Sequence, residues 1–252
     1  MGYKKIILSL VWTILIFGVG VLLYAINLHK KNETCQSISI EINNSNENHF
    51  IDSSLVMDYI EGNALLGNAA ENIDASKIEA LLEGNPHIKN AEVYKDLSGT
   101  LFIKIWQRNA VMHVINSAGE GYYIDDQEMK IPLSDNFSPR VLVCHGNIEE
   151  KCTKCDTINS NILKTCSCIA QFVHNSSFWG SAIEEIFVSA ENEILLTPKM
   201  GDAKIVFGDA SDVENKFDRL FAFYKQALSK KGWDKYSSIN LSFKNQIVAK
   251  KK

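Results

Sequence analysis

The sequence predicts an α+β protein built from three successive parts, and three observations support this prediction. The first is an uncharged apolar run from Ile6 to Ile26, long enough for a single N-terminal transmembrane helix. The second is the order strand, helix, helix, strand, strand between residues 38 and 109. The third is a series of alternating segments over residues 110–252, which predicts a mixed or antiparallel β domain with a C-terminal helix and strand.

The apolar run is interpreted as a retained membrane anchor. Its 21 residues include no charged, proline or amide side chain, and a helix of this length covers about 30 Å, the thickness of a bilayer's hydrocarbon core. The run also exceeds the apolar part of a secretory signal peptide, about 7–15 residues. Lysines flank the run on both sides, so charge alone does not set its orientation. We expect residues 1–5 to form a short cytoplasmic tail, residues 6–26 the anchor and residues 27–37 a polar tether to an exported part.

A small domain is expected at residues 38–109. Ile38 to Ile42 alternates between apolar and polar side chains, which predicts a half-buried strand. Asp52 or Ser53 is suited to cap a first helix and Asp74 a second, since each precedes an apolar stripe at helical spacing. Alternation then returns in two further strands, at residues 91–95 and 101–107. Such an order packs two helices against one face of a small mixed sheet.

The second domain, residues 110–252, is predicted to be mainly β. Strands are expected at residues 111–115, 122–124, 129–133, 141–143, 183–188, 193–197 and 203–207. A helix is expected from Thr157 to His174, with a shorter segment near residues 178–182. Ser211 and Glu214 have the spacing of a capping box before the C-terminal helix. Tyr236 to Ala249 is predicted to form one long final strand region.

Composition and motifs exclude several function classes. Lys and Arg number 26 against 30 Asp and Glu, a net charge of −4 that leaves no electrostatic footprint for nucleic acid. The sequence has no P-loop, G-x-S-x-G or H-E-x-x-H pattern. We therefore expect no catalytic residue, metal ligand, cofactor or small-molecule substrate.

Cysteines form the sharpest local cluster: Cys144, Cys152, Cys155, Cys166 and Cys168. A C-x-x-C followed by a C-x-C can supply four thiolates to zinc, and Cys152 with Cys155 can form a redox pair. However, Cys166 and Cys168 fall in a predicted helix, where side chains two residues apart point about 200° apart. Structural cysteines, a local disulfide, a metal site and redox catalysis all stay open. A membrane-anchored thiol-redox or zinc-binding protein is thus the alternative function.

The terminal strand favours an interaction function. Ile239, Leu241 and Phe243 alternate with polar neighbours, as in a half-buried strand. A terminal strand at a sheet edge carries unpaired backbone N–H and C=O groups that accept a partner strand. The alternative is an interior strand with both sides paired.

Several segments together resemble a known family. They are the strand–helix–helix–strand–strand unit behind a single span, GYYID at 121–125, ILLTPKMGDAKIVFGD at 194–209 and WDKYSSINLSFKNQIVAKK at 233–251. In this order they resemble the FtsQ/DivIB family of bacterial cell-division proteins, particularly Bacteroidetes members, and the first unit resembles the family's POTRA domain. The sequence departs from the family at two turns: Ala110 replaces a proline, and the hairpin at residues 125–130 lacks its usual glycine.

The resemblance implies a non-enzymatic scaffold in the bacterial inner membrane, with a cytoplasmic N-terminus and periplasmic C-terminal domains. It implies binding of FtsB- and FtsL-like partners during septum formation, by addition of a partner strand to the terminal strand. The residues that match this strand are Tyr236, Leu241, Phe243, Asn245, Gln246, Ile247 and Val248. A POTRA-type chaperone for outer-membrane proteins is a third hypothesis, but it normally goes with a barrel or tandem POTRA units, which this sequence does not show.

Overall fold

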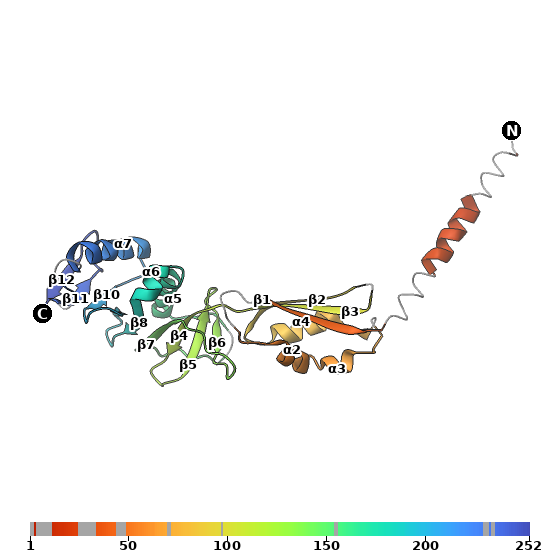
Figure 1. The fold of residues 1–252 in the computed structure, drawn as a ribbon, viewed down its shortest axis with the longest axis horizontal. Helices are drawn as coiled ribbons and strands as arrows, with labels where there is room; N and C mark the ends of the chain where they lie inside the picture. Colours follow the sequence, from red (N-terminus) through yellow and green to blue (C-terminus); the bar gives the residue numbers. More distant parts are fainter. Residues whose placement is uncertain are drawn as a thin grey trace. The chain divides into compact units, whose positions relative to one another are not determined.

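The computed structural model describes residues 3, 12–24, 34–43, 49–69, 72–96, 98–153, 156–228, 232 and 235–252. The chain forms two compact units (Figure 1). One consists of Met1–Asn43 and Ile51–Trp106, and the other of Asn44–Phe50 and Gln107–Lys252. Residues 12–24 are helical with exposed side chains, whereas the remainder of the predicted anchor, residues 6–11, 25 and 26, lies outside the described residues. Among the helices in the described ranges, none combines the length and the apolar character that crossing a bilayer requires.

The first unit contains a three-stranded sheet in the order β1-β3-β2. Its strands are β1 (Ser37–Asn43), β2 (Ile88–Lys95) and β3 (Thr100–Gln107). β1 runs parallel to β3, with Ile38 opposite Leu101 and Ile40 opposite Ile103. The apolar face predicted for β3 is fully buried at Leu101, Ile103 and Ile105.

Three helices accompany this sheet: α2 (Ser53–Tyr59), α3 (Gly62–Leu65) and α4 (Ala75–Glu83). Asp52, one of the two candidates for the first cap, and Asp74, the predicted second cap, both cap their helices. The Asp52 carboxylate accepts the backbone N–H of Leu55 at 2.9 Å, and the Asp74 carboxylate accepts that of Lys77 at 3.3 Å. Hydrogen bonds from Ser54 and Leu55 lower the pKa of Asp52. The short α3 was not predicted.

The second unit contains a nine-stranded mixed sheet in the order β12-β11-β10-β9-β8-β7-β4-β5-β6. The strands are β4 (Ala110–Ile115), β5 (Gly121–Asp125), β6 (Lys130–Pro132), β7 (Leu142–Gly146), β8 (Ile183–Val188), β9 (Ile194–Pro198), β10 (Lys204–Val206), β11 (Tyr236–Asn240) and β12 (Val248–Lys251). The pairs β4–β7, β7–β8 and β10–β11 are parallel, and the other neighbours are antiparallel. The structure therefore confirms the α+β class and the mixed sheet.

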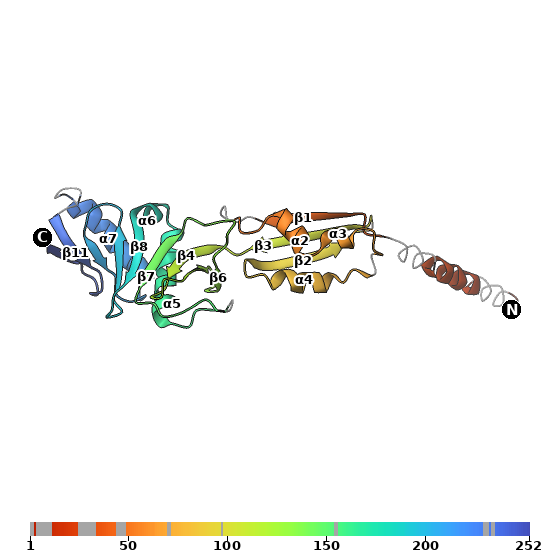
Figure 2. The same cartoon turned by 90° about the horizontal axis from the view of Figure 1, so that it is seen from below.

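The helices α5 (Asn161–His174), α6 (Ser177–Ala182) and α7 (Val213–Phe223) pack against this sheet, and a π-helix, Tyr224–Leu228, extends α7 (Figures 1 and 2). Fully buried side chains from the helices meet those from the strands in one core; they include Leu163, Cys166, Ile169, Phe217 and Leu220 with Val114, Ile186, Leu196 and Ile205. The rings of Phe217 and Trp179 lie 4.8 Å apart between α7 and α6.

Two helices begin later than predicted, and in both cases a carboxylate outside the helix is the reason. The Glu150 side chain accepts the backbone N–H groups of Asn159 and Ser160 at 2.9 Å each, so α5 begins at Asn161 instead of Thr157. Ser211 does not cap α7, because its hydroxyl and backbone N–H donate to Asp209.

Candidate functional site

The C-terminal segment folds as a hairpin, so the prediction of one long strand over residues 236–249 was wrong. β11 and β12 are antiparallel, with Ile239 opposite Ala249 and Asn240 opposite Val248. Residues 241–247 connect the two strands, and we call them the β11–β12 loop. Asn245 takes a left-handed conformation with φ 60°, and the Asn240 side chain accepts the backbone N–H of Ser242 at 2.9 Å. These local turns interrupt a segment whose apolar alternation continues through the loop.

The hairpin makes β12 the last strand of the nine-stranded sheet (Figure 1). At the opposite end, β6 is partly covered: Lys130 donates its backbone N–H to the Asp156 carbonyl at 3.0 Å, and Met129 forms a bridge with Thr157. Pro132 in β6 has no N–H to offer. Within the described part of the chain no strand pairs with the outer side of β12.

The hydrogen bonds of β12 indicate which backbone groups face outward. Lys252 donates its N–H to the Lys235 carbonyl at 3.1 Å, and the Lys250 carbonyl accepts the Ser237 hydroxyl at 3.2 Å. Both groups therefore point toward β11. Because backbone groups alternate along an antiparallel strand, the N–H and C=O groups of Ala249 are directed to the open side. The Lys251 carbonyl instead accepts the Ser237 hydroxyl of β11 at 3.5 Å, beside a register shift in the pairing.

The structure separates the seven sequence-predicted site residues into two sets. Tyr236 is 6% exposed and its ring packs against Phe223, with centroids 5.4 Å apart. Leu241 is 0% exposed and donates its backbone N–H to the Val206 carbonyl at 2.8 Å. These two side chains belong to the core. The others lie on the β11–β12 loop or at its junction with β12: Phe243, Asn245, Gln246 and Val248 are exposed, and Ile247 is half-buried.

Arg219, on α7, holds the β11–β12 loop and was missed by sequence reasoning. Its Nη1 donates to the Phe243 carbonyl at 2.8 Å and to the Gln246 carbonyl at 2.7 Å. Its Nη2 donates to the Leu241 carbonyl at 3.3 Å. A single arginine on a helix has no sequence signature for such a role, because the carbonyls it contacts lie more than 20 positions further along the chain.

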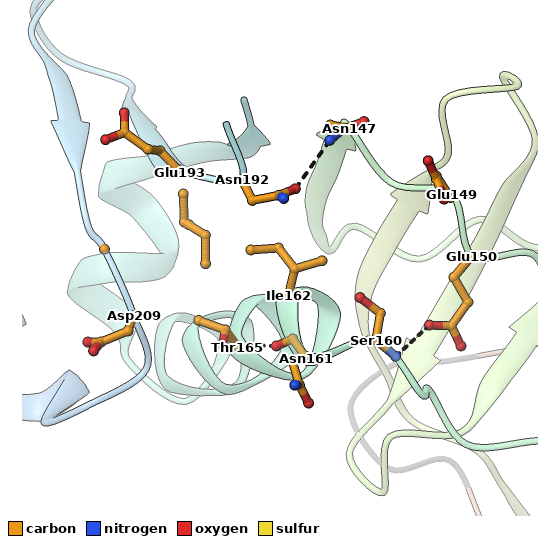
Figure 3. A pocket seen from close by; sticks show the side chains of 12 residues that line it. Asn147, Glu149, Glu150, Ser160, Asn161, Ile162, Thr165, Asn192, Glu193 and Asp209 are labelled. Atoms are coloured by element: carbon orange, nitrogen blue, oxygen red, sulfur yellow. Dashed lines mark hydrogen bonds between the residues drawn. The ribbon is translucent and has the colours of Figure 1, made fainter. Parts of the chain in front are cut away.

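A polar cleft of about 900 Å³ lies between the N-terminal end of α5, the turn after β7 and the β8–β9 turn (Figure 3). Its acidic groups include Glu150, whose pKa is lowered by the backbone N–H groups of Asn159 and Ser160 and by Lys130, against the effect of burial. They also include Asp209, which pairs with the buried Lys216 at 2.7 Å. These two carboxylates stabilise the fold. The described residues that line the cleft include no histidine or cysteine.

The structure brings two of the described cysteines, Cys144 and Cys166, into contact. Cys144 on β7 and Cys166 on α5 are both fully buried, and the hydrogen bond between the two thiols, together with burial, favours the neutral Cys144 thiol and raises the pKa of Cys144. Cys168 is exposed, as expected from its two-residue offset from Cys166 on the helix. Cys155 lies outside the described residues. Among the described residues no three His, Cys, Asp or Glu side chains gather in a way that could hold a metal ion.

Comparison with known proteins agrees with this architecture. The family described as FtsQ/DivIB, C-terminal related, matches residues 109–250, more than half of the chain, and a POTRA-like domain matches residues 33–106. A similar protein is the cell division protein DivIB of Clostridium tetani, 24% identical over 183 residues. This match covers 70% of the chain and 66% of that relative, slightly less than two thirds of its length. The chain belongs to the FtsQ/DivIB family.

Proposed function

We propose that this protein is a non-enzymatic scaffold of the cell-division machinery that binds FtsB- and FtsL-like proteins by accepting a partner strand at β12. In this proposal residues 1–5 form a cytoplasmic tail, residues 6–26 the inner-membrane anchor and residues 27–37 a tether. Residues 38–109 form the POTRA-like domain and residues 110–252 the partner-binding domain, both in the periplasm. Family membership supports the role in cell division.

The observation that carries the proposal is the difference between the two ends of the nine-stranded sheet. β6 is partly covered by residues 156–157 and contains Pro132, whereas the hydrogen bonds of β12 to β11 leave the backbone groups of Ala249 directed toward the open side. An added strand gains affinity from these backbone groups and specificity from the side chains that flank them.

The charge on β12 favours a partner with a different sequence over a second copy of this chain. Lys250 and Lys251 lie on β12, and Lys252, which follows, pairs with Asp202 at 2.8 Å. Two copies of this strand paired in parallel register would place the lysines of both opposite each other, and like charges on adjacent strands are destabilising. Lysines on edge strands commonly prevent such self-pairing.

Substitution of Ala249 tests the backbone pairing directly. Proline at this position removes an outward N–H and leaves the β11–β12 hydrogen bonds in place, since proline is tolerated on an edge strand. Ala249→Ser is the matched control because it keeps the N–H. We expect Ala249→Pro to weaken binding of the FtsB-type protein of the same organism at least tenfold, measured by interferometry on the full chain in detergent. Wild-type affinity in a folded Ala249→Pro protein would contradict strand addition at this edge.

Phe243 tests the contribution of the loop. Its side chain is 46% exposed, and an exposed aromatic residue beside a binding edge is a typical anchor. We expect Phe243→Ala to reduce co-purification of the FtsB-type protein while the melting temperature stays close to that of the wild type. Deletion of residues 243–252 is expected to abolish co-purification. Retained binding after this deletion would exclude the whole hairpin as the site.

The membrane topology is tested separately. The uncharged run of residues 6–26 supports the anchor, and residues 12–24 are helical with exposed apolar side chains. We expect the protein to stay in the membrane fraction after carbonate extraction. An alkaline phosphatase fusion after residue 252 is expected to be active, because this enzyme folds only outside the cytoplasm. An inactive, stable fusion would contradict the periplasmic location.

A further inference from the structure

We propose that Arg219 is a positioning residue for partner binding: its guanidinium fixes the β11–β12 loop so that β12 is already in place for the incoming strand. This inference rests on the proposed function and adds a residue that does not itself touch the partner strand. It is carried by the three hydrogen bonds from one side chain to the Leu241, Phe243 and Gln246 carbonyls.

The Arg219 side chain starts from a well-packed position on α7. Arg219 directly precedes Leu220 on α7, and Leu220 and Phe217 are both fully buried in the core of the unit. The buried Nε of Arg219 has no hydrogen-bond partner within the described part of the chain. All the hydrogen bonds of this guanidinium within the described part of the chain thus come from Nη1 and Nη2 and go to the loop carbonyls. An arginine presents its donors as a rigid planar fork, and its bonds carry the charge of the guanidinium.

The loop depends on this contact between its two fixed ends. At the first end, Leu241 is buried and bonded to Val206, and a Cβ at Gly208 would lie 3.0 Å from that of Ser242. At the other end, Val248 pairs with Asn240. Ser242, Phe243, Lys244, Asn245 and Gln246 between these ends are all exposed. The Arg219 bonds to Phe243 and Gln246 span this exposed part.

The consequence for binding follows from the strand pairing. β12 is short, and β11 is its neighbour on one side only. When the loop is not fixed, β12 pairs with β11 for a smaller fraction of the time. The apparent dissociation constant rises by the inverse of that fraction. If the ordered fraction falls to about a tenth, affinity falls about tenfold.

The test compares Arg219→Met, which keeps the aliphatic stem, with Arg219→Lys, which keeps the charge but loses the planar fork. Arg140→Met is the matched control, since Arg140 is an exposed arginine of the same unit. Two readouts are taken on the full chain in detergent. One is the affinity for the FtsB-type protein of the same organism, and the other is hydrogen–deuterium exchange of the peptides that cover residues 241–251.

We expect Arg219→Met to bind about tenfold more weakly, with faster exchange confined to residues 241–251, and Arg219→Lys to be intermediate. The Arg140→Met control is expected to match the wild type in both readouts. A role in global stability alone would instead raise exchange throughout Gln107–Lys252, and that result would overturn the inference. Wild-type affinity in Arg219→Met, with Ala249→Pro still defective, would overturn it while sparing the proposed function. If the wild type fails to bind, the proposed function fails, and unchanged exchange in Arg219→Met would then separately refute the positioning role.

Discussion

Removal of the Asp125 carboxylate should strongly destabilise the larger unit. Its side chain is 0% exposed, and its Oδ2 accepts Nη1 of Arg108 at 2.8 Å. Its Oδ1 accepts the backbone N–H groups of Gln127 and Met129, each at 2.8 Å. One carboxylate therefore both neutralises a largely buried guanidinium and closes the β5–β6 turn. The change Asp125→Asn separates these two tasks, because its remaining oxygen can still accept the two turn N–H groups.

The expected loss in the free energy of unfolding comes from breaking the ion pair between Arg108 and Asp125. The asparagine NH₂ group replaces Oδ2 and faces Nη1 of Arg108, so two donors oppose each other. Arg108 is only 15% exposed, and leaving one member of a buried ion pair without its partner costs about 3–5 kcal/mol. Asp125→Ala also leaves the Gln127 and Met129 N–H groups without an acceptor, which adds about 1–3 kcal/mol. We therefore expect Asp125→Asn to lose about 3–5 kcal/mol and Asp125→Ala to lose more.

The assay is guanidinium unfolding of the purified chain, with the buried Trp179 as a fluorescent reporter in this unit. Asp135→Asn, an exposed change of the same chemistry, is the control and should stay within about 0.5 kcal/mol of the wild type. A cycle with Arg108→Met isolates the pair energy from other effects. A loss below about 1 kcal/mol for Asp125→Asn, at unchanged denaturant slope, would refute the reasoning.

Three further predictions concern single positions. Glu128 has φ 63° in the β5–β6 turn. Glu128→Gly relieves roughly 1–2 kcal/mol of left-handed backbone strain and costs about 0.5–1 kcal/mol in chain entropy. We therefore expect a small gain in melting temperature, and a lower melting temperature would contradict this. Gly146 has φ 114°, and a Cβ there would lie 2.1 Å from the Val188 carbonyl oxygen. Gly146→Ala should lower the free energy of unfolding by at least about 2 kcal/mol in the same unfolding assay. A neutral effect would show that β7 and β8 can move apart to admit the methyl group. Hydrogen bonds from Lys216 and Ser211 lower the pKa of Asp209 to about 2, so its carboxylate stabilises the folded state above the unfolded pKa and loses that contribution as pH falls toward the folded pKa. Between about pH 4 and 2 the melting temperature should therefore fall less steeply for Asp209→Asn than for the wild type. Parallel curves in melting scans from about pH 5 to pH 2 would contradict the assignment.

The sequence predicted the class of the fold because its signals are local. Alternation marked most strands, and the carboxylates of Asp52 and Asp74 marked two helix starts that the structure confirms. The errors arose where a carboxylate outside the helix bound groups that the predicted helix start would have used. Glu150 binds the N–H groups before α5, and Asp209 takes the Ser211 hydroxyl that would have capped α7. Rules for helix caps compare residues three or four positions apart, so they do not include a carboxylate ten positions before Ser160.

The candidate site also depends on contacts that the sequence pattern did not predict. Alternation over Ile239, Leu241 and Phe243 matched a strand, yet Leu241 is buried at the start of a loop and Phe243 is exposed within it. The alternating pattern could not show that the chain reverses. The reversal depends on Asn245 adopting φ 60° and on hydrogen bonds from Arg219, on α7, to carbonyls of the β11–β12 loop. Partner-binding residues were therefore predicted as a segment, and the structure separates that segment into core and exposed positions.

The hairpin changes what the proposed strand addition would require of this protein. A single long strand would offer an edge fixed along its whole length by the sheet. β12 instead comprises four residues, Val248–Lys251, and reaches the sheet only through β11. Its availability to a partner then depends on how firmly the β11–β12 loop is held, and the loop is held from α7 by Arg219. Substitutions on α7 that face away from any partner should therefore change partner affinity, whereas substitutions of comparable size on α5 should not.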